Sequence, residues 1–250
     1  MKAIIVGNWK MNPTTFRQAA ALLEATKKAA EKTRTFVIVA PPVIFLRELK
    51  KKFRGGRIAY AVQHAHFDER GAHTGDISLA QAKDAGATYV LVGHAERRGL
   101  GETNDDTRKK VAAALAHKMT PILCVGEATR GAGGEHFELV KEQLKVGLTD
   151  VGATKLGKIL LVYEPLWTIG TSATMSPRDM HEMAIFIRKT VVELHGEAGH
   201  TVTILYGGSI DETNAQDMLQ NGDIRGLLLG RASEDPHKIR TLLQVVAETP

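Results

Sequence analysis

The stretch ILLVYEPLWTIGT, residues 159–171, decides how the rest of the chain is interpreted. Its apolar start is typical of a strand that is buried on both faces. Glu164 follows this strand, Pro165 then begins a loop, and bulky residues at the loop tip lead to Gly170 and Thr171. A rigid start, an apolar tip and a flexible finish are typical of a lid that closes over a site as one body. A strand ending in an ordinary surface turn is the alternative, and the rest of the chain decides between them.

Eight short apolar runs recur along the chain, and each is followed by a segment with a helical pattern. None of the eight alternates strictly between apolar and polar residues, which indicates parallel strands covered on both faces. The runs lie at residues 3–6, 36–40, 58–62, 89–92, 121–125, 159–163, 202–206 and 227–229. Eight βα units predict a closed α/β barrel, the (β/α)8 fold, as one domain over residues 1–250. A doubly wound open sheet would need a glycine-rich turn after the first strand, where the chain reads GNWK.

Composition narrows the class of protein. Hydrophobic residues make up 43% and charged residues 24% of the 250 residues, as in ordinary globular proteins. No apolar run approaches the roughly 20 residues of a membrane helix, and the N-terminal apolar segment is too short for a signal peptide. The single cysteine, Cys124, excludes an internal disulfide framework and fits the reducing cytoplasm. The net charge of +5 lies on helix faces without interleaved aromatic residues, so we expect no nucleic-acid partner but attraction of a small anionic substrate.

The residues just after each strand are the candidates for function, because (β/α)8 barrels build their sites from the loops at the carboxyl ends of the strands. Lys10 follows the first strand and could hold an anion there. His94 follows the fourth strand and starts a helical turn, where backbone N–H groups and the helix dipole favour the neutral imidazole. We expect Glu96 to pair with Arg97 or Arg98 and so hold this turn.

Two glycine- and serine-containing turns follow the seventh and eighth strands. The first contains Gly208 and Ser209, and the second contains Gly230 and Arg231. Backbone N–H groups in such a pair of turns bind phosphate in this fold. The two turns together therefore predict a phosphate site.

Motifs over the whole chain resemble the triosephosphate isomerase family. They are NWK at residues 8–10, GAHTGDIS at 71–78, GHAERR at 93–98, CVGE at 124–127, YEPLWTIGT at 163–171 and YGGS at 206–209. They occur in the family's order and at nearly its spacing. The resemblance implies a TIM barrel that interconverts dihydroxyacetone phosphate and D-glyceraldehyde 3-phosphate in glycolysis and gluconeogenesis, without cofactor or metal.

The resemblance also assigns catalytic roles. Glu164 would remove the proton α to the carbonyl and return it to the neighbouring carbon. His94 would polarise the carbonyl and move protons between the two oxygens of the enediol, while Lys10 and Asn8 would stabilise the charge on those oxygens. Glu96 belongs to the same catalytic group.

The remaining implied residues bind phosphate, close the site or join subunits. Phosphate binding falls to Gly170, Gly208, Ser209, Gly230 and Arg231. The lid comprises Pro165, Leu166, Trp167, Thr168, Ile169, Gly170 and Thr171. The loop around Thr74 and Gly75 would insert into a second subunit beside Asn8 and Lys10, which implies a homodimer.

Four features depart from the family pattern. Ala95 replaces a serine and removes a hydroxyl near the catalytic pair. The segment Gly99, Leu100, Gly101 is shortened and lacks an aromatic residue. Ser172 stands where a glycine is frequent at the end of the lid. Arg231 replaces the second glycine of the phosphate loop, and its guanidinium either points to solvent or reshapes the phosphate site.

Three alternatives stay open at this point. A related isomerase of a four-carbon ketose phosphate is one, because Arg231 lies where substrate length would be sensed. A metal-dependent hydrolase is another, because His64 and His66 lie near Asp68 and His73. That pattern lies in the expected dimer loop, however, and has no further ligands at other strand ends, so we expect no catalytic metal. A barrel that binds without catalysis is the third.

Overall fold

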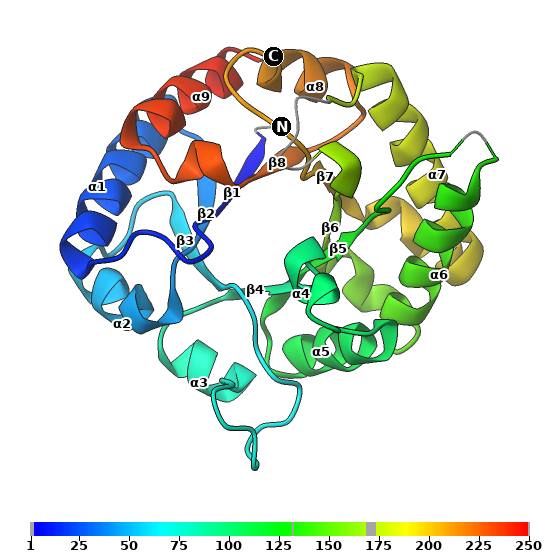
Figure 1. The fold of residues 1–250 in the computed structure, drawn as a ribbon, viewed down its shortest axis with the longest axis horizontal. Helices are drawn as coiled ribbons and strands as arrows, with labels where there is room; N and C mark the ends of the chain where they lie inside the picture. The colour runs from blue at the N-terminus through cyan, green and yellow to red at the C-terminus, as the bar shows by residue number, and fades with distance from the viewer. Residues whose placement is uncertain (1–2, 132, 169–173, 250) are drawn as a thin grey trace.

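The computed structural model describes residues 3–131, 133–168 and 174–249. Within them, eight parallel strands close into one barrel in the order β1 to β8, and β1 is hydrogen-bonded to both β2 and β8. Figure 1 shows the helices as a ring around the strands. The predicted (β/α)8 architecture is confirmed. The strands are β1 Ile4–Asn8, β2 Phe36–Ala40, β3 Ile58–Val62, β4 Tyr89–Val92, β5 Thr120–Val125, β6 Leu160–Tyr163, β7 Thr203–Tyr206 and β8 Gly226–Leu229.

The α-helices follow the strands in turn. They are α1 Phe16–Thr33, α2 Val43–Lys52, α3 Leu79–Asp84, α4 Ala95–Gly99, α5 Asn104–Ala116, α6 Glu135–Leu148, α7 Pro177–His195, α8 Ala215–Asn221 and α9 Pro236–Glu248. Short 3-10 helices lie at η1 Ala153–Lys158, η2 Leu166–Thr168, η3 Gly196–Thr201 and η4 Arg231–Ser233. Among the described helices, none combines the length and the apolar character needed to cross a membrane.

Two apolar layers explain the continuous apolar strands. Alternate strand residues such as Val6, Ile38 and Ile122 fill the barrel interior. Their neighbours, such as Ile5 and Val37, pack outward against the helices. Both faces of each strand are therefore buried, as the sequence pattern predicts.

Local capping sets the helix starts. The Ser176 side chain caps α7 by accepting from the Asp179 N–H, and Pro177 is the first helical residue. The cap of α5 lies one residue before Asn104, which is the first residue of the helix. Thr103 is the cap, because its hydroxyl accepts from the Asp106 N–H and the Asp106 carboxylate accepts from the Thr103 N–H.

The loop between β3 and α3 projects away from the barrel (Figure 1). The start and the end of this loop lie side by side, because the His66 N–H donates to the Ile77 carbonyl at 2.8 Å. Thr74 and Gly75 are exposed within it, and Gly75 has a φ of 92° that favours glycine. The projecting loop is the one predicted to contact a second subunit.

Candidate active site

One pocket at the carboxyl ends of the strands contains most of the predicted site residues. Asn8 and Lys10 enter it from β1 and the following turn, His94 from the end of β4 and Glu164 from the end of β6. The turns after β7 and β8 complete the wall with Gly208, Ser209, Gly230 and Arg231. Residues up to 224 positions apart in the chain, Asn8 and Ala232, therefore line a single site.

The turn after β1 holds Lys10 in a strained conformation. Its φ of 50° lies in the left-handed region that residues other than glycine seldom adopt. The Asn8 side chain accepts from the Lys10 N–H at 3.0 Å, and the Gln63 amide donates to the Lys10 carbonyl at 2.7 Å. These bonds fix the direction of the Lys10 side chain, whose Nζ lies 2.8 Å from Glu96 Oε1.

Glu96 thus does not pair as the sequence analysis predicts. The expected pair with Arg97 or Arg98 is wrong, because the carboxylate reaches across the pocket mouth to Lys10 instead. The Arg98 guanidinium turns inward and donates to the Gly93 carbonyl at 2.8 Å. Glu96 therefore acts on the ammonium of Lys10, and Arg98 supports the turn that carries His94.

His94 caps the short helix α4 with its own ring. Its Nδ1 accepts from the Glu96 N–H at 3.2 Å, so the lone pair is on Nδ1 and the ring proton of the neutral imidazole is on Nε2. Nε2 lies 3.3 Å from Asn8 Nδ2 and 3.3 Å from Glu164 Oε1. The His94 Nε2–H therefore faces the Glu164 carboxylate in a buried site, and the Asn8 amide lies beside the same ring nitrogen.

Hydrogen bonds hold both the backbone and the side chain of Glu164 in place. Its backbone N–H donates to the Val125 carbonyl at 2.8 Å, and its side chain is 3% exposed. Carboxylate oxygen Oε2 accepts from the Ala95 N–H at 3.0 Å. Because this donor belongs to the backbone, the alanine at position 95 still supplies a hydrogen bond to the base. Gly126 is required beside it, since a Cβ there would lie 1.9 Å from the Glu164 carbonyl oxygen.

Glu127 anchors the start of the lid, a role that the sequence analysis missed. The Tyr163 hydroxyl donates to both of its carboxylate oxygens, at 2.7 and 2.9 Å, and the Trp167 indole donates to one at 3.0 Å. The Glu127 carbonyl also accepts from the Leu166 N–H at 2.9 Å. The available signal was a carboxylate straight after an apolar strand, in the CVGE motif. The lid residues Pro165, Leu166, Trp167 and Thr168 are thus placed, whereas Ile169, Gly170, Thr171 and Ser172 lie outside the described residues.

Glu102 supports the turn before His94, and it too was missed. Its Oε1 accepts from the Gly93 N–H at 2.7 Å, and its Oε2 lies 2.6 Å from the buried Lys110 ammonium. Burial alone would raise the pKa of Glu102, but hydrogen bonds from His64 and Lys110 and the Lys110 charge outweigh it and lower the pKa to about 2. The carboxylate is therefore ionised while it holds the turn.

The turn after β7 approaches its neighbours closely. A Cβ on Gly208 would lie 2.1 Å from the Tyr206 hydroxyl and 2.9 Å from Thr168 Oγ1, so only glycine fits there. Ser209 and Gly230 line the same pocket. Arg231 opens η4 with an exposed side chain, and no ion pair to it is found within the described residues.

The histidines of the projecting loop lie away from this pocket. His66, Asp68 and His73 line a second cavity that shares none of its described lining residues with the first. His64 instead contacts Asp76, at 3.2 Å. Within the described residues, therefore, these loop side chains do not line the pocket of Glu164 and His94.

Comparisons with known proteins agree with this geometry. The sequence profile of the Triosephosphate isomerase family matches residues 3–246. The chain belongs to the triosephosphate isomerase family. It is 36% identical over 246 residues to the triosephosphate isomerase of Endomicrobium trichonymphae, covering 97% of this chain and 98% of that protein. It is 38% identical over 235 residues to that of Thermoanaerobacter pseudethanolicus, covering 93% and 94%.

A solved structure supports the same assignment. The crystal structure of triosephosphate isomerase from Bartonella henselae superposes with a TM-score of 0.86 at 30% identity, covering 98% of this chain and 99% of that one. The chain is therefore an isomerase of the triosephosphate isomerase family, in which catalysis uses no cofactor.

Proposed function

We propose that this isomerase interconverts dihydroxyacetone phosphate and D-glyceraldehyde 3-phosphate through an enediolate, with Glu164 as the base. The observation that carries the proposal is the placement of the Glu164 carboxylate 3.3 Å from His94 Nε2, in a pocket that Lys10 also lines. A carboxylate opposite N–H donors can remove a carbon-bound proton while the donors receive the charge that forms on oxygen. The family's reaction requires this pairing of groups.

The proton transfers follow from the positions of the groups. Glu164 takes the proton from the carbon next to the carbonyl, and His94 donates its Nε2 proton toward the oxygen that becomes negative. Asn8 donates to the same region, and Lys10 adds a positive charge. Glu164 then returns its proton to the neighbouring carbon, while His94 recovers a proton from the hydroxyl of the carbon that becomes the new carbonyl. Both groups end in their starting protonation states, so no cofactor is needed. Burial strengthens each of these interactions, because little water competes for the donors.

The phosphate group is assigned to the other wall of the pocket. Backbone N–H groups of the turns at Ser209 and Gly230 would bind its oxygens, and Gly208 lets the substrate approach the chain. The lid that begins at Pro165 would close over the enediolate and exclude water, which protects it from losing phosphate. Glu127 supports this role by fixing the first residues of the lid.

A coupled assay tests the proposal. The purified protein is expected to convert glyceraldehyde 3-phosphate into dihydroxyacetone phosphate, which a dehydrogenase then reduces with measurable loss of NADH. Activity should be unchanged after treatment with a chelator, because none of the proposed steps uses a metal. A well-folded protein without turnover would favour a binding role instead, and loss of activity on chelation would favour metal chemistry.

Arg231→Gly tests whether the substituted phosphate loop changes substrate choice. If the guanidinium contacts phosphate, the variant should show a KM for triose phosphate raised roughly tenfold with kcat little changed, since one charged hydrogen bond is worth about 1.5–3 kcal/mol. Side-by-side kcat/KM values for triose and tetrulose phosphates measure the effect of Arg231 on substrate length. Arg178→Gly, on the outer helix α7, is the matched control. Identical kinetics on every sugar phosphate would mean that Arg231 only faces solvent.

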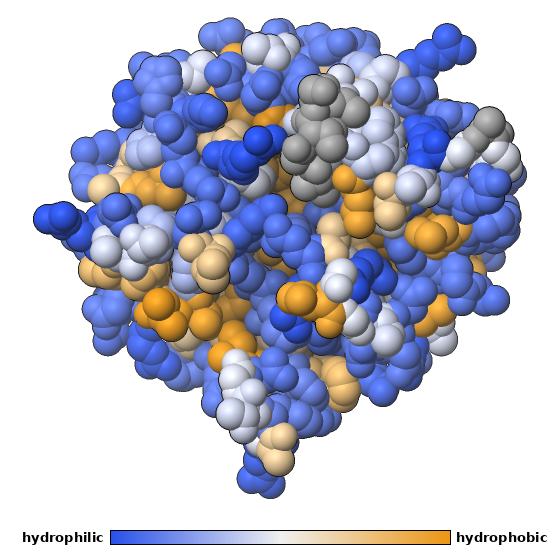
Figure 2. All heavy atoms as spheres, viewed as in Figure 1, coloured by the Kyte–Doolittle hydropathy of each residue, from blue (hydrophilic) through white to orange (hydrophobic). Residues whose placement is uncertain are grey.

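We further propose a homodimer that forms through the projecting loop. Large apolar side chains, Met11, Ile44 and Leu100, are exposed by 90%, 76% and 77%. On the face that Figure 2 shows, hydrophobic residues reach the surface above the projecting loop. Exposed apolar surface of this kind marks an interface. The loop carrying Thr74 would insert into the partner.

Ile44→Glu should therefore yield monomers, because a carboxylate cannot be buried unpaired in the interface. Sedimentation velocity on the full chain measures the change. Ile185→Glu on helix α7, where Ile185 is 53% exposed, is the control and should leave the dimer intact. A wild-type monomer, or a dimer that survives Ile44→Glu, would contradict this interface.

We also propose that the enzyme works in the cytoplasm. Its single cysteine, Cys124, is buried, so no disulfide stabilises the described fold. Burial, and then the charge of Glu164, raise the pKa of the Cys124 thiol, which keeps it neutral and poorly reactive. These features suit a reducing compartment, where the reactions of glycolysis take place.

A further inference from the structure

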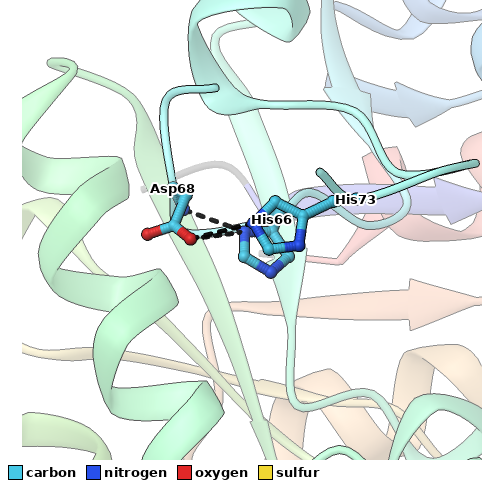
Figure 3. A group of neighbouring side chains, drawn as sticks. All are labelled: His66, Asp68 and His73. Carbon is cyan, nitrogen blue, oxygen red and sulfur yellow. Dashed lines mark hydrogen bonds and ion pairs between the residues drawn. The ribbon is translucent and has the colours of Figure 1, made fainter. Parts of the chain in front are cut away.

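We propose that His66, Asp68 and His73 form a binding site for a divalent cation of the zinc class in the loop between β3 and α3. Each side chain offers one ligand atom, and these atoms all lie within 4.8 Å of one another. Figure 3 shows the Asp68 carboxylate facing both imidazoles. Two imidazole nitrogens and one carboxylate suit Zn²⁺, whereas Mg²⁺ and Ca²⁺ prefer oxygen ligands alone.

The distances between the donor atoms are close to those of a zinc site. Asp68 Oδ2 lies 3.0 Å from His73 Nε2 and 3.7 Å from His66 Nδ1. Ligand atoms at the corners of a tetrahedron with zinc bonds of about 2.0–2.1 Å lie about 3.3 Å apart. The two separations that involve Asp68 therefore lie within a few tenths of an ångström of this value, and the two imidazole nitrogens lie within 4.8 Å of each other.

One ring has to turn for both imidazoles to aim at the same ion. The rings of His66 and His73 stack with centroids 3.7 Å apart and planes 23° apart. His66 is the fixed partner, because its Nδ1 accepts from the Asp68 N–H at 3.0 Å and its side chain is only 16% exposed. His73 is the more exposed of the two, with a side chain that is 36% exposed, so it is the ring that would turn toward the ion. The ion would replace the Asp68 N–H at His66 Nδ1.

The surroundings leave room for the ion and attract it. The three residues line a cavity of about 190 Å³, large enough for a water molecule as a fourth ligand. Three carboxylates line this cavity, those of Asp68, Glu69 and Asp76. The Arg70 guanidinium is the one Lys or Arg group among its described lining residues. The local charge is therefore negative, although the whole chain carries a net charge of +5.

A cation at this place would tie together the two limbs of the loop. His66 lies on the limb leaving β3 and is already bridged to Ser78 on the returning limb. His73 lies seven residues further along the chain, beside the exposed Thr74. Binding would therefore restrict the residues that approach a second subunit, and it would do so without any part in the proton transfers at Glu164.

Metal titration of the chelator-treated, full-length protein tests the site. We expect one Zn²⁺ per chain by isothermal titration calorimetry, and intense visible absorption from tetrahedral Co²⁺ in its place. Asp68→Asn and His73→Phe should each weaken Zn²⁺ binding by about 10–100-fold, and neither changes a residue of the catalytic pocket. His200→Gln is the control. His200 is an exposed histidine next to Glu197, and it lies far from this loop in the sequence.

Hydrogen exchange provides a second measurement that does not depend on isomerase activity. Zn²⁺ should slow exchange over residues 66–76 in the wild type but not in His73→Phe. Thermal unfolding curves of the metal-free variants verify that they fold. The proposal is overturned if the wild type binds no Zn²⁺ at one per chain, or if Asp68→Asn and His73→Phe bind it as tightly as His200→Gln does. Either result leaves the proposed isomerisation untouched.

Discussion

Glu164→Gln is expected to lower kcat for triose phosphate isomerisation by about 10²–10⁴-fold, the range typical for loss of a general base. The amide has nearly the shape of the carboxylate but cannot accept the proton from carbon. Its position should be kept, because an amide oxygen can still accept from the Ala95 N–H that now holds Oε2 at 3.0 Å. KM should change little, since the phosphate turns that bind the substrate are intact.

Two further variants make this result specific. Glu164→Asp retains the carboxylate but draws it back by one methylene, so its kcat should fall less than that of Glu164→Gln. Glu197→Gln removes a carboxylate whose side chain is 98% exposed, and its kinetics should equal those of the wild type. Coupled steady-state assays in both directions measure all three. A Glu164→Gln enzyme with the turnover of the wild type would remove Glu164 from the reaction.

The barrel was predictable because a strand that is buried on both faces consists of a continuous apolar run. The runs at residues 36–40, 58–62 and 89–92 coincide with β2, β3 and β4, and the other strands begin or end within two residues of the expected positions. Parallel strands also place their carboxyl ends on one rim. Asn8, His94 and Glu164 could therefore be assigned to one site before any distance was known.

Partnerships across the site were not predictable in the same way. The arginines next to Glu96 in the sequence favoured an ion pair within the same turn. The folded chain instead pairs Glu96 with Lys10, which is 86 residues away. Glu127 belongs to a recognised motif, but only the folded chain brings the Trp167 indole within 3.0 Å of it. The same is true of His66 and His73, whose rings meet only because the loop folds back. Such contacts depend on how loops pack, which no local pattern encodes.

Glu102→Gln should produce the largest loss of stability among single substitutions of this site. The side chains of Glu102 and Lys110 are only 2% and 7% exposed, and their charged atoms lie 2.6 Å apart. Removing one charge leaves the Lys110 ammonium buried without its counter-charge, which typically costs about 3–5 kcal/mol. The turn at Gly93 should also loosen, so kcat should fall because His94 follows this turn.

The pH dependence of stability provides an independent measurement of the same pair. The pKa of Glu102 in the folded protein is about 2, below its ordinary value of 4.5, so its contribution is complete above pH 4.5 and is lost as the pH falls toward 2. Across this window, the wild type should lose about 3 kcal/mol more of its free energy of unfolding than Glu102→Gln does. Urea unfolding at a series of pH values measures this difference.

A double-mutant cycle separates the pair from general damage to α5. Lys110→Met added to Glu102→Gln should recover part of the lost stability, because the unpaired ammonium is then gone. Asp105→Asn is the matched control on the same helix, since Asp105 pairs with Arg108 and Lys109 at the surface and contributes little there. If Glu102→Gln unfolds at the same urea concentration as Asp105→Asn, the buried pair does not hold the turn that presents His94.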